Sequence, residues 1–214
     1  MITAVLFDLD GTLADTAPDL TYALNALRGA RKMPPLSLDA TRPVASHGAR
    51  GLIGVGFGIA PGALGYDSLR DQFLALYEAH LARSTMLFPG MPELLATLEK
   101  RGMQWGVVTN KLERFTHPLL DSLKLSARAA CVVGGDTTPY SKPHPAPLLA
   151  ATRMIHVPPE ACVYVGDDRR DVEAGRAAGM KVAVAGWGYL NGNDAETWGA
   201  DWMLKNPLDL LRFL

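Results

Sequence analysis

Five short apolar runs alternate along the chain with longer segments of helical spacing. The runs occupy 3–7, 104–108, 130–133, 162–165 and 182–185, and valine is frequent in them. Such short, continuous apolar runs are typical of strands that are buried on both faces. The segments 92–101, 113–123, 145–154 and 169–178 space their apolar residues as amphipathic helices do. This alternation predicts an α/β fold in which helices cover both faces of a parallel sheet.

The stretch between the first and second apolar runs departs from this rhythm. It contains two helical segments, 18–31 and 67–83, on either side of a glycine-rich middle, 48–65, that also carries enough large apolar residues to be ordered. We therefore predict a helical insertion, the cap, over residues 15–85. The core domain would then consist of residues 1–14 and 86–214.

The composition of the chain does not indicate a function, but it argues against several classes of protein. The chain has 214 residues and a formal net charge of −1, so no electrostatic footprint for nucleic acid or an anionic membrane is visible, and no protein partner is indicated. The N-terminus runs directly into an apolar strand pattern without the features of a signal peptide. Cys131 and Cys162 each lie in an apolar run, which favours two buried thiols over a disulfide or a metal pair. Together these features predict a cytoplasmic protein.

Two carboxylates follow the first predicted strand, in the sequence Asp8-Leu9-Asp10-Gly11-Thr12. Ligands of open parallel sheets bind at the carboxyl ends of strands. Within a strand Asp8 and Asp10 would point to opposite faces, so they can converge only if the strand has ended and Gly11 lets the chain turn. A pair of solvated acids at a turn is the alternative interpretation. A calcium loop is disfavoured because Thr12 and Leu13 stand where a further acid and a glycine are needed.

A second group of acids follows the fourth apolar run, in Gly166-Asp167-Asp168, with Asp171 one helical turn later. Asp8, Asp10 and Asp167 at neighbouring strand ends would offer the hard oxygen ligands that suit Mg²⁺. Acids crowded together without a cation would repel one another strongly, and a metal ion would relieve that repulsion. For Asp168 an N-cap role is the alternative, and for Asp171 a place in the first helical turn.

Two further polar segments complete the candidate site. Thr109 and Asn110 end the second apolar run, and both can donate hydrogen bonds to phosphate oxygens. Lys142 lies in a proline-stiffened turn before a helix, where a rigidly held ammonium would offset the charge of a carboxylate nucleophile and a phosphate. A solvated loop lysine is the alternative for Lys142.

These pieces, in order and in context, resemble the motifs of the haloacid dehalogenase-like phosphatase superfamily. The first motif is matched by residues 8–12, the second by Thr109, the third by Lys142, and the fourth by Gly166-Asp167-Asp168 with Asp171. The resemblance covers essentially the whole chain, including a helical cap after the first motif. It implies a Rossmann-like core, a cap, and hydrolysis of small phosphate esters.

The resemblance also implies roles for individual residues. In this family the first aspartate attacks phosphorus and forms an aspartyl-phosphate, which here is the part of Asp8. Asp10 would protonate the leaving alkoxide and then deprotonate the attacking water. Thr109 and Lys142 would anchor the transferring phosphoryl group. Mg²⁺ would be held by Asp8, Asp167 and the backbone carbonyl of Asp10.

The middle of the insertion, Ser46-His47-Gly48-Ala49-Arg50-Gly51, resembles the cap loop of the phosphoglycolate phosphatase branch. Arg50 is expected to bind a substrate carboxylate through a two-pronged contact, with His47 beside it. A surface arginine with a chance neighbour is the alternative. Trp187-Gly188-Tyr189, after the last apolar run, could either border the mouth of the site or pack against it.

Within that branch, the runs 90–95, 105–111 and 198–201 resemble a subset that is similar to N-acetylmuramic acid 6-phosphate phosphatase. Both candidate substrates carry a carboxylate beside a phosphomonoester, so Arg50 suits either. A phosphomutase of the same superfamily is an alternative, because it would share every core residue. A dehalogenase would lack the acid at position 10. A non-catalytic phospho-ligand sensor is a remote alternative, because none of Asp8, Asp10, Lys142 and Asp167 is missing.

Overall fold

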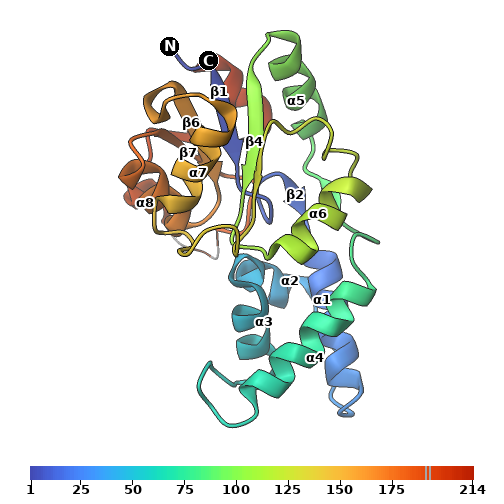
Figure 1. The fold of residues 1–214 in the computed structure, drawn as a ribbon. Coiled ribbons are helices and arrows are strands. Elements are labelled where there is room, and N and C mark those ends of the chain that lie inside the picture. The colour runs from blue at the N-terminus through green and yellow to red at the C-terminus, as the bar shows by residue number, and fades with distance from the viewer. Residues whose placement is uncertain (191, 193) are drawn as a thin grey trace.

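A six-stranded parallel sheet forms one half of the molecule in the computed structural model, which describes residues 1–190, 192 and 194–214 (Figure 1). Its strands are β1 (Ala4–Phe7), β4 (Gln104–Val108), β5 (Val132–Val133), β6 (Cys162–Gly166), β7 (Lys181–Ala185) and β8 (Trp202–Leu204). They lie in the order β5-β4-β1-β6-β7-β8, and each neighbouring pair is parallel. The predicted parallel sheet is confirmed, and β8 is an additional strand at its edge.

Helices cover both faces of this sheet, as predicted. They are α5 (Met91–Lys100), α6 (Glu113–Ser122), α7 (Ala146–Ile155) and α8 (Arg169–Ala177), with short 3-10 helices at Pro159–Ala161, Ala195–Trp198 and Pro207–Arg212. Because side chains alternate along a strand, Val5 and Phe7 pack with α5 and α6, whereas Ala4 and Leu6 pack with α7 and α8. Within the part of the chain that the structure describes, no helix has the length and apolar character needed to cross a bilayer.

The chain leaves the sheet and returns to it through a pair of short antiparallel strands, β2 (Ala14–Asp15) and β3 (Met86–Leu87). Between them lie α1 (Ala17–Gly29), α2 (Leu38–Thr41), a 3-10 helix (Arg42–His47), α3 (Gly48–Phe57) and α4 (Tyr66–Ala79). These helices are found beyond one end of the sheet strands (Figure 1). β2 and β3 thus enclose the helices that the sequence analysis assigned to an insertion, and the division into a cap and a core domain stays a prediction.

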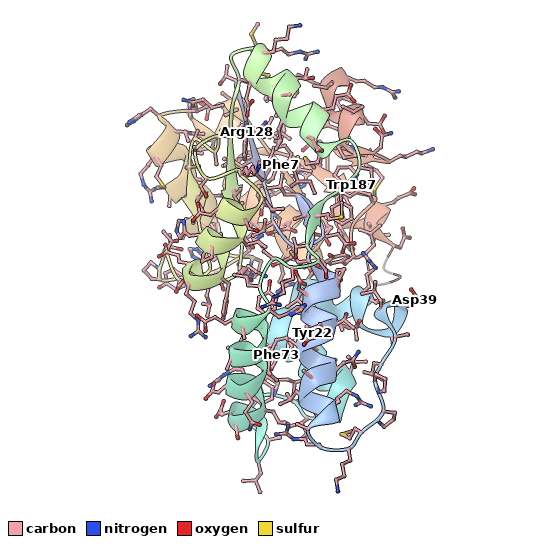
Figure 2. The ribbon with its side chains drawn as sticks, turned by 90° about the vertical axis from the view of Figure 1, so that its right-hand side faces the viewer. Phe7, Tyr22, Asp39, Phe73, Arg128 and Trp187 are labelled. Carbon is pink, nitrogen blue, oxygen red and sulfur yellow. The ribbon has the colours of Figure 1, made fainter. Side chains whose placement is uncertain are left out.

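The inserted helices share a hydrophobic core of their own. Leu24 of α1, Ile53 of α3 and Phe73 of α4 are buried together, and Figure 2 shows Phe73 beside α1. The glycine-rich stretch begins with α3, whose buried side carries Leu52 and Ile53, while Val55 is exposed. Phe88 and Phe115 join this core from the sheet side of the molecule. The insertion is thus packed directly over one end of the sheet.

Both cysteines are buried and unpaired, as the sequence pattern predicted. Cys162 begins β6, and Cys131 directly precedes β5. Burial raises the pKa of the Cys131 thiol to about 12 and that of Cys162 to about 11. Both therefore stay in the unreactive thiol form at neutral pH.

Candidate active site

Asp8, Thr109 and Asp167 lie at the carboxyl ends of three adjacent strands. They directly follow β1, β4 and β6, and β1 lies between the other two in the sheet. All three are buried, with exposed fractions of 7%, 2% and 1%. The strand order alone therefore brings together polar side chains from three distant parts of the sequence, at the sheet edge where ligands bind in this architecture.

A tight turn after β1 carries Asp10 back over the strand end. The amide of Gly11 donates to the carbonyl of Ala14 over 3.0 Å, and the amide of Leu13 donates to the carbonyl of Asp8 over 3.3 Å. Gly11 has a φ of +84°, and a Cβ at this position would collide with the Asp167 carboxylate. Glycine is required here for both reasons, because it permits the left-handed backbone and leaves room for Asp167.

Lys142 is buried at the centre of the site. Its ammonium nitrogen donates to the carbonyl of Val108 over 3.1 Å, to the hydroxyl of Tyr164 over 2.7 Å, and to Asp171 Oδ1 over 2.7 Å. These contacts use its three protons. Asp8 Oδ1 lies 2.9 Å from the same nitrogen and forms an ion pair with it. Lys142 therefore attracts Asp8 by charge and holds it at the end of β1.

The loop that carries Lys142 is held by Asn110. The Asn110 amide donates to the backbone carbonyl of Lys142, and its oxygen accepts from the backbone amide of Lys142, both over 2.9 Å. This reciprocal pair fixes the loop against the end of β4. Asn110 was expected to donate to phosphate, and one amide proton remains for that purpose.

Asp10 is paired with a lysine that the motif analysis did not single out. Lys111 Nζ lies 2.8 and 3.0 Å from the two carboxylate oxygens of Asp10, and the Thr16 hydroxyl donates to Asp10 as well. The Lys111 side chain is 7% exposed. Burial acts to lower the pKa of Lys111, but the charge of Asp10, the neighbouring Tyr77 and the hydrogen bonds to both together outweigh it, and the net shift is upward. Lys111 thus stays an ammonium and holds Asp10 in place.

The 3-10 helix of the insertion contacts the acids of the sheet directly. The Ser46 hydroxyl donates to Asp167 Oδ2 over 3.0 Å, and His47 Nε2 lies 3.5 Å from Asp168. Arg170 pairs with Asp168 over 2.8 Å and also donates to the carbonyl of Ser46 over 3.0 Å. Asp168 accepts from the backbone amide of Arg170 as the N-cap of α8, as expected. It also links this helix to the insertion.

A cavity of about 250 Å³ lies between the insertion and the strand ends. Its polar wall includes Asp8, Asp10, Ser46, His47, Thr109, Asn110, Lys111, Lys142, Asp168, Arg170 and Asp171, and its apolar wall Leu20, Ala45, Ala49, Phe73, Leu74, Tyr77, Leu112 and Phe115. The predicted phosphate-handling residues and His47 therefore share one cavity. Arg50 does not line it: this exposed side chain borders an adjoining depression, which shares His47 and Arg170 with the cavity.

The loop after β7 serves as a support rather than a wall of this cavity. Tyr189 is 4% exposed, its backbone amide donates to Asp167 over 2.8 Å, and its hydroxyl accepts from the amides of Thr16 and Ala17. The Trp187 indole donates to the carbonyl of Thr12 over 2.9 Å. The sequence analysis expected residues 187–189 either to border the mouth of the site or to pack against it. The contacts show that they pack against it.

Comparison with known proteins agrees with this geometry. The model of the family described as haloacid dehalogenase-like hydrolase matches residues 5–185. The chain belongs to the haloacid dehalogenase-like hydrolases. The resemblance stated from the motifs and the enzyme class, a phosphatase, are confirmed at the level of the family.

Several phosphatases of this hydrolase family resemble the chain over its whole length. An N-acetylmuramic acid 6-phosphate phosphatase of Pseudomonas putida is 41% identical over 100% of the chain and 96% of its own length. A phosphoglycolate phosphatase of Xanthomonas campestris is 45% identical over 97% of the chain and 94% of its own length. The crystal structure of a predicted phosphoglycolate phosphatase from Haemophilus somnus superposes with a TM-score of 0.87 at 26% identity, covering 99% of this chain and 97% of that one.

The acids of this hydrolase site fit a divalent cation. Oxygen atoms of Asp8, Asp167 and Asp171 lie within 4.8 Å of one another. Burial raises the pKa of Asp8 to about 6, and burial together with the neighbouring acids raises the pKa of Asp167 well above its ordinary value. Lys142, paired with Asp8 and Asp171, cannot alone neutralise three buried carboxylates. Hard oxygen donors that are short of positive charge are what Mg²⁺ requires.

The predicted Mg²⁺ ligands and the acids that cluster in the structure differ by one residue. The cluster contains Asp171 where the sequence analysis named Asp10. Asp171 is bound by Lys142 and accepts from the backbone amide of Asp168. The Asp10 carboxylate turns toward Lys111, which agrees with an expected contribution from its backbone carbonyl rather than from its side chain.

Three cavity residues were not found from the sequence. Lys111 directly follows Thr109-Asn110, and Arg170 lies between the acids of the fourth motif, so their positions beside motif residues were an available signal. Tyr77 is one apolar position among several on α4 and carried no such signal. Only the packing of α4 over the strand ends brings it to the cavity.

The raised pKa of Asp8 predicts that stabilisation by Mg²⁺ depends on pH. Without metal, a carboxyl whose pKa rises from 3.8 to about 6 on folding stabilises the folded state fully below its unfolded pKa and loses that contribution as the pH rises through the folded value. A cation replaces the missing proton. Mg²⁺ should therefore raise the melting temperature more near neutral pH than around pH 5, measured by thermal unfolding with EDTA as reference. Equal shifts at both pH values, or equal shifts from sodium at matched ionic strength, would contradict a metal at Asp8.

Proposed function

We propose that the protein is a Mg²⁺-dependent phosphatase that hydrolyses a carboxylated phosphomonoester through an aspartyl-phosphate on Asp8. The observation that carries this proposal is the buried Asp8 carboxylate, which is paired with Lys142 over 2.9 Å and lines the cavity. An oxygen of Asp8 attacks phosphorus, and the ester P–O bond breaks as the new P–O bond forms. The leaving alkoxide takes a proton from Asp10.

Water completes the cycle in a second displacement. It attacks the same phosphorus atom and gives a proton to Asp10, and phosphate leaves as the Asp8 carboxylate is restored. The ion pair between Asp10 and Lys111 represents the ionised form of Asp10 that this second step needs. Pairing with Lys111, which also lines the cavity, fixes the position of that carboxylate.

Positive charge and hydrogen-bond donors surround the place where the phosphoryl group would lie. The Thr109 hydroxyl accepts from the amide of Lys111, which leaves its own proton for a phosphoryl oxygen. Lys142 offsets the charge of Asp8 and of the phosphate. Phosphoryl transfer depends mainly on positioning and charge neutralisation, so these few groups suffice. Mg²⁺, held by Asp8, Asp167 and the Asp10 carbonyl, would supply the remaining charge neutralisation.

The apolar wall of the cavity favours a substrate larger than phosphoglycolate. Phe73, Leu74, Leu112 and Phe115 line the cavity, whose volume of about 250 Å³ lies just below the usual range for small-molecule sites. A two-carbon glycolyl group would leave this apolar surface without a partner. N-acetylmuramic acid 6-phosphate has methyl groups to cover it and a carboxylate beside a phosphomonoester. We therefore propose this ester, on which the relative from Pseudomonas putida acts by name, as the preferred substrate.

If the substrate binds in this cavity, a residue other than Arg50 has to bind its carboxylate. Arg50, the expected partner, lies outside it, whereas Arg170 lines it and donates to Asp168 only through Nε and Nη2. No described residue pairs with its remaining Nη1 group in the structure, so Arg170 can offer that group to a substrate carboxylate. A cytoplasmic location remains a prediction alongside this proposal.

The test is phosphate release from a panel of esters. The purified protein with Mg²⁺ is incubated with N-acetylmuramic acid 6-phosphate, phosphoglycolate, glucose 6-phosphate and glucose 1-phosphate. We expect kcat/KM for the muramic acid ester to exceed that for phosphoglycolate by at least about tenfold, because about 1.4 kcal/mol of extra apolar contact is enough for that ratio. A preference for phosphoglycolate would overturn the substrate assignment. Conversion of glucose 1-phosphate to glucose 6-phosphate without free phosphate would instead establish a mutase.

A further inference from the structure

The hydroxyl of Tyr77 is buried, and none of the described residues accepts its proton. Tyr77 is 1% exposed and lies on α4, where it lines the cavity opposite the strand ends. Burying a hydroxyl without a partner destabilises a protein, and most buried hydroxyls have one. Because the Tyr77 hydroxyl borders the cavity, a bound ligand could supply the missing hydrogen-bond acceptor.

The surroundings of this hydroxyl select the kind of ligand group. Phe73 stacks at 6.4 Å and Phe115 meets the Tyr77 ring edge-on at 5.5 Å. Lys111 lies over the ring, 4.9 Å from its centre, and its charge is already neutralised by both oxygens of Asp10. Of the residues that the structure describes, Lys111 is the cation over this ring, and its pairing with Asp10 leaves it unable to compensate a carboxylate there. A neutral acceptor with an apolar substituent fits the aromatic walls better.

The protonation state of the phenol agrees with a donor role. Burial raises the pKa of Tyr77 to about 12, an effect that the nearby charge of Lys111 only partly offsets. The group is therefore a neutral hydroxyl throughout the physiological range and can donate one hydrogen bond. Phe has the same shape without that donor, so a single substitution isolates the hydroxyl.

We infer that Tyr77 is a specificity-determining residue that donates a hydrogen bond to a neutral carbonyl of the substrate, such as that of an acetamido group. The inference rests on the proposed function, since it concerns the organic part of the same phosphate ester. The methyl group of an acetamido substituent would pack between Phe73 and Phe115, and its carbonyl would receive the Tyr77 proton. The phosphate would lie at the other wall, beside Asp8 and Lys142.

The test combines one enzyme variant with two substrates. Tyr77→Phe is compared with the wild type on N-acetylglucosamine 6-phosphate, which carries the acetamido group, and on glucose 6-phosphate, which has a hydroxyl in its place. We expect kcat/KM to fall about tenfold on the acetamido ester, mainly through KM, and less than about twofold on glucose 6-phosphate. The melting temperature without substrate should be unchanged or higher, because an unpaired buried hydroxyl has been removed.

Tyr66→Phe is the matched control, because Tyr66 lies on the same helix and does not line the cavity. It should leave both substrates unaffected. An equal fall on both esters with Tyr77→Phe, or no fall on either, would overturn the inference while leaving the phosphatase intact. Failure of the proposed function looks different, because the wild type would then release no phosphate from any ester.

Discussion

Asp8→Asn is expected to abolish phosphate release from every ester, with kcat reduced by at least about 10⁴-fold. The carboxamide has no anionic oxygen to attack phosphorus, so no covalent intermediate can form. The substitution keeps the size and shape of the side chain. The measurement is steady-state phosphate release in saturating Mg²⁺, compared with Asp121→Asn, an exposed position on α6 that should behave as the wild type.

The same variant should be more stable than the wild type when Mg²⁺ is absent. Because burial raises the pKa of Asp8 from 3.8 to about 6, the ionised carboxylate costs up to about 3 kcal/mol of folding free energy near neutral pH. Asparagine removes that charge, and Lys142 keeps Asp171 as its partner. If Asp8→Asn is inactive but more stable than the wild type, the Asp8 carboxylate serves the reaction and not the stability of the fold. Wild-type turnover by Asp8→Asn would assign the nucleophile to another residue.

The strands of the sheet were predictable because continuous apolar runs leave few alternatives. The run 104–108 coincides with β4, and 162–165 differs from β6 by one residue. β8 (Trp202–Leu204) escaped prediction because it is three residues long and lies at the edge, where Met203 is 39% exposed. A short edge strand has one hydrogen-bonded neighbour and is less buried, so it needs fewer apolar side chains. Its sequence therefore shows no clear hydrophobic pattern.

The convergence of the strand-end residues was also predictable, because parallel strands deliver their carboxyl ends to one edge. Contacts made across the cavity were not. Whether Arg50 faces the site depends on the rotational setting of α3, which places Gly48 and Ala49 at the cavity and Arg50 outside. The position of Tyr77 likewise depends on how α4 packs over the sheet. Periodicity identifies the buried side of a helix but not the element that it meets.

Lys142→Met is expected to impair both folding and turnover. The methionine keeps much of the hydrocarbon and removes the ammonium, so Asp8 and Asp171 lose their counter-charge in a buried site. Breaking a buried ion pair from one side costs about 3–5 kcal/mol, and we expect this loss in the free energy of unfolding by urea near neutral pH. Lys181→Met is the control, since its pair with Asp201 is half-exposed and worth at most about 1 kcal/mol.

A second substitution separates the two roles of Lys142. Lys142→Met combined with Asp171→Asn removes the unpaired charge together with the missing ammonium, so most of the lost stability should return. Turnover should stay at least about 10²-fold below that of the wild type, because no cation replaces Lys142 beside Asp8 and the phosphoryl group. Recovery of activity in step with stability would show that Lys142 only supports the fold. Stability without activity would place its ammonium in the reaction itself, since the Asp8 carboxylate would remain while the charge that attracts the phosphate would be gone.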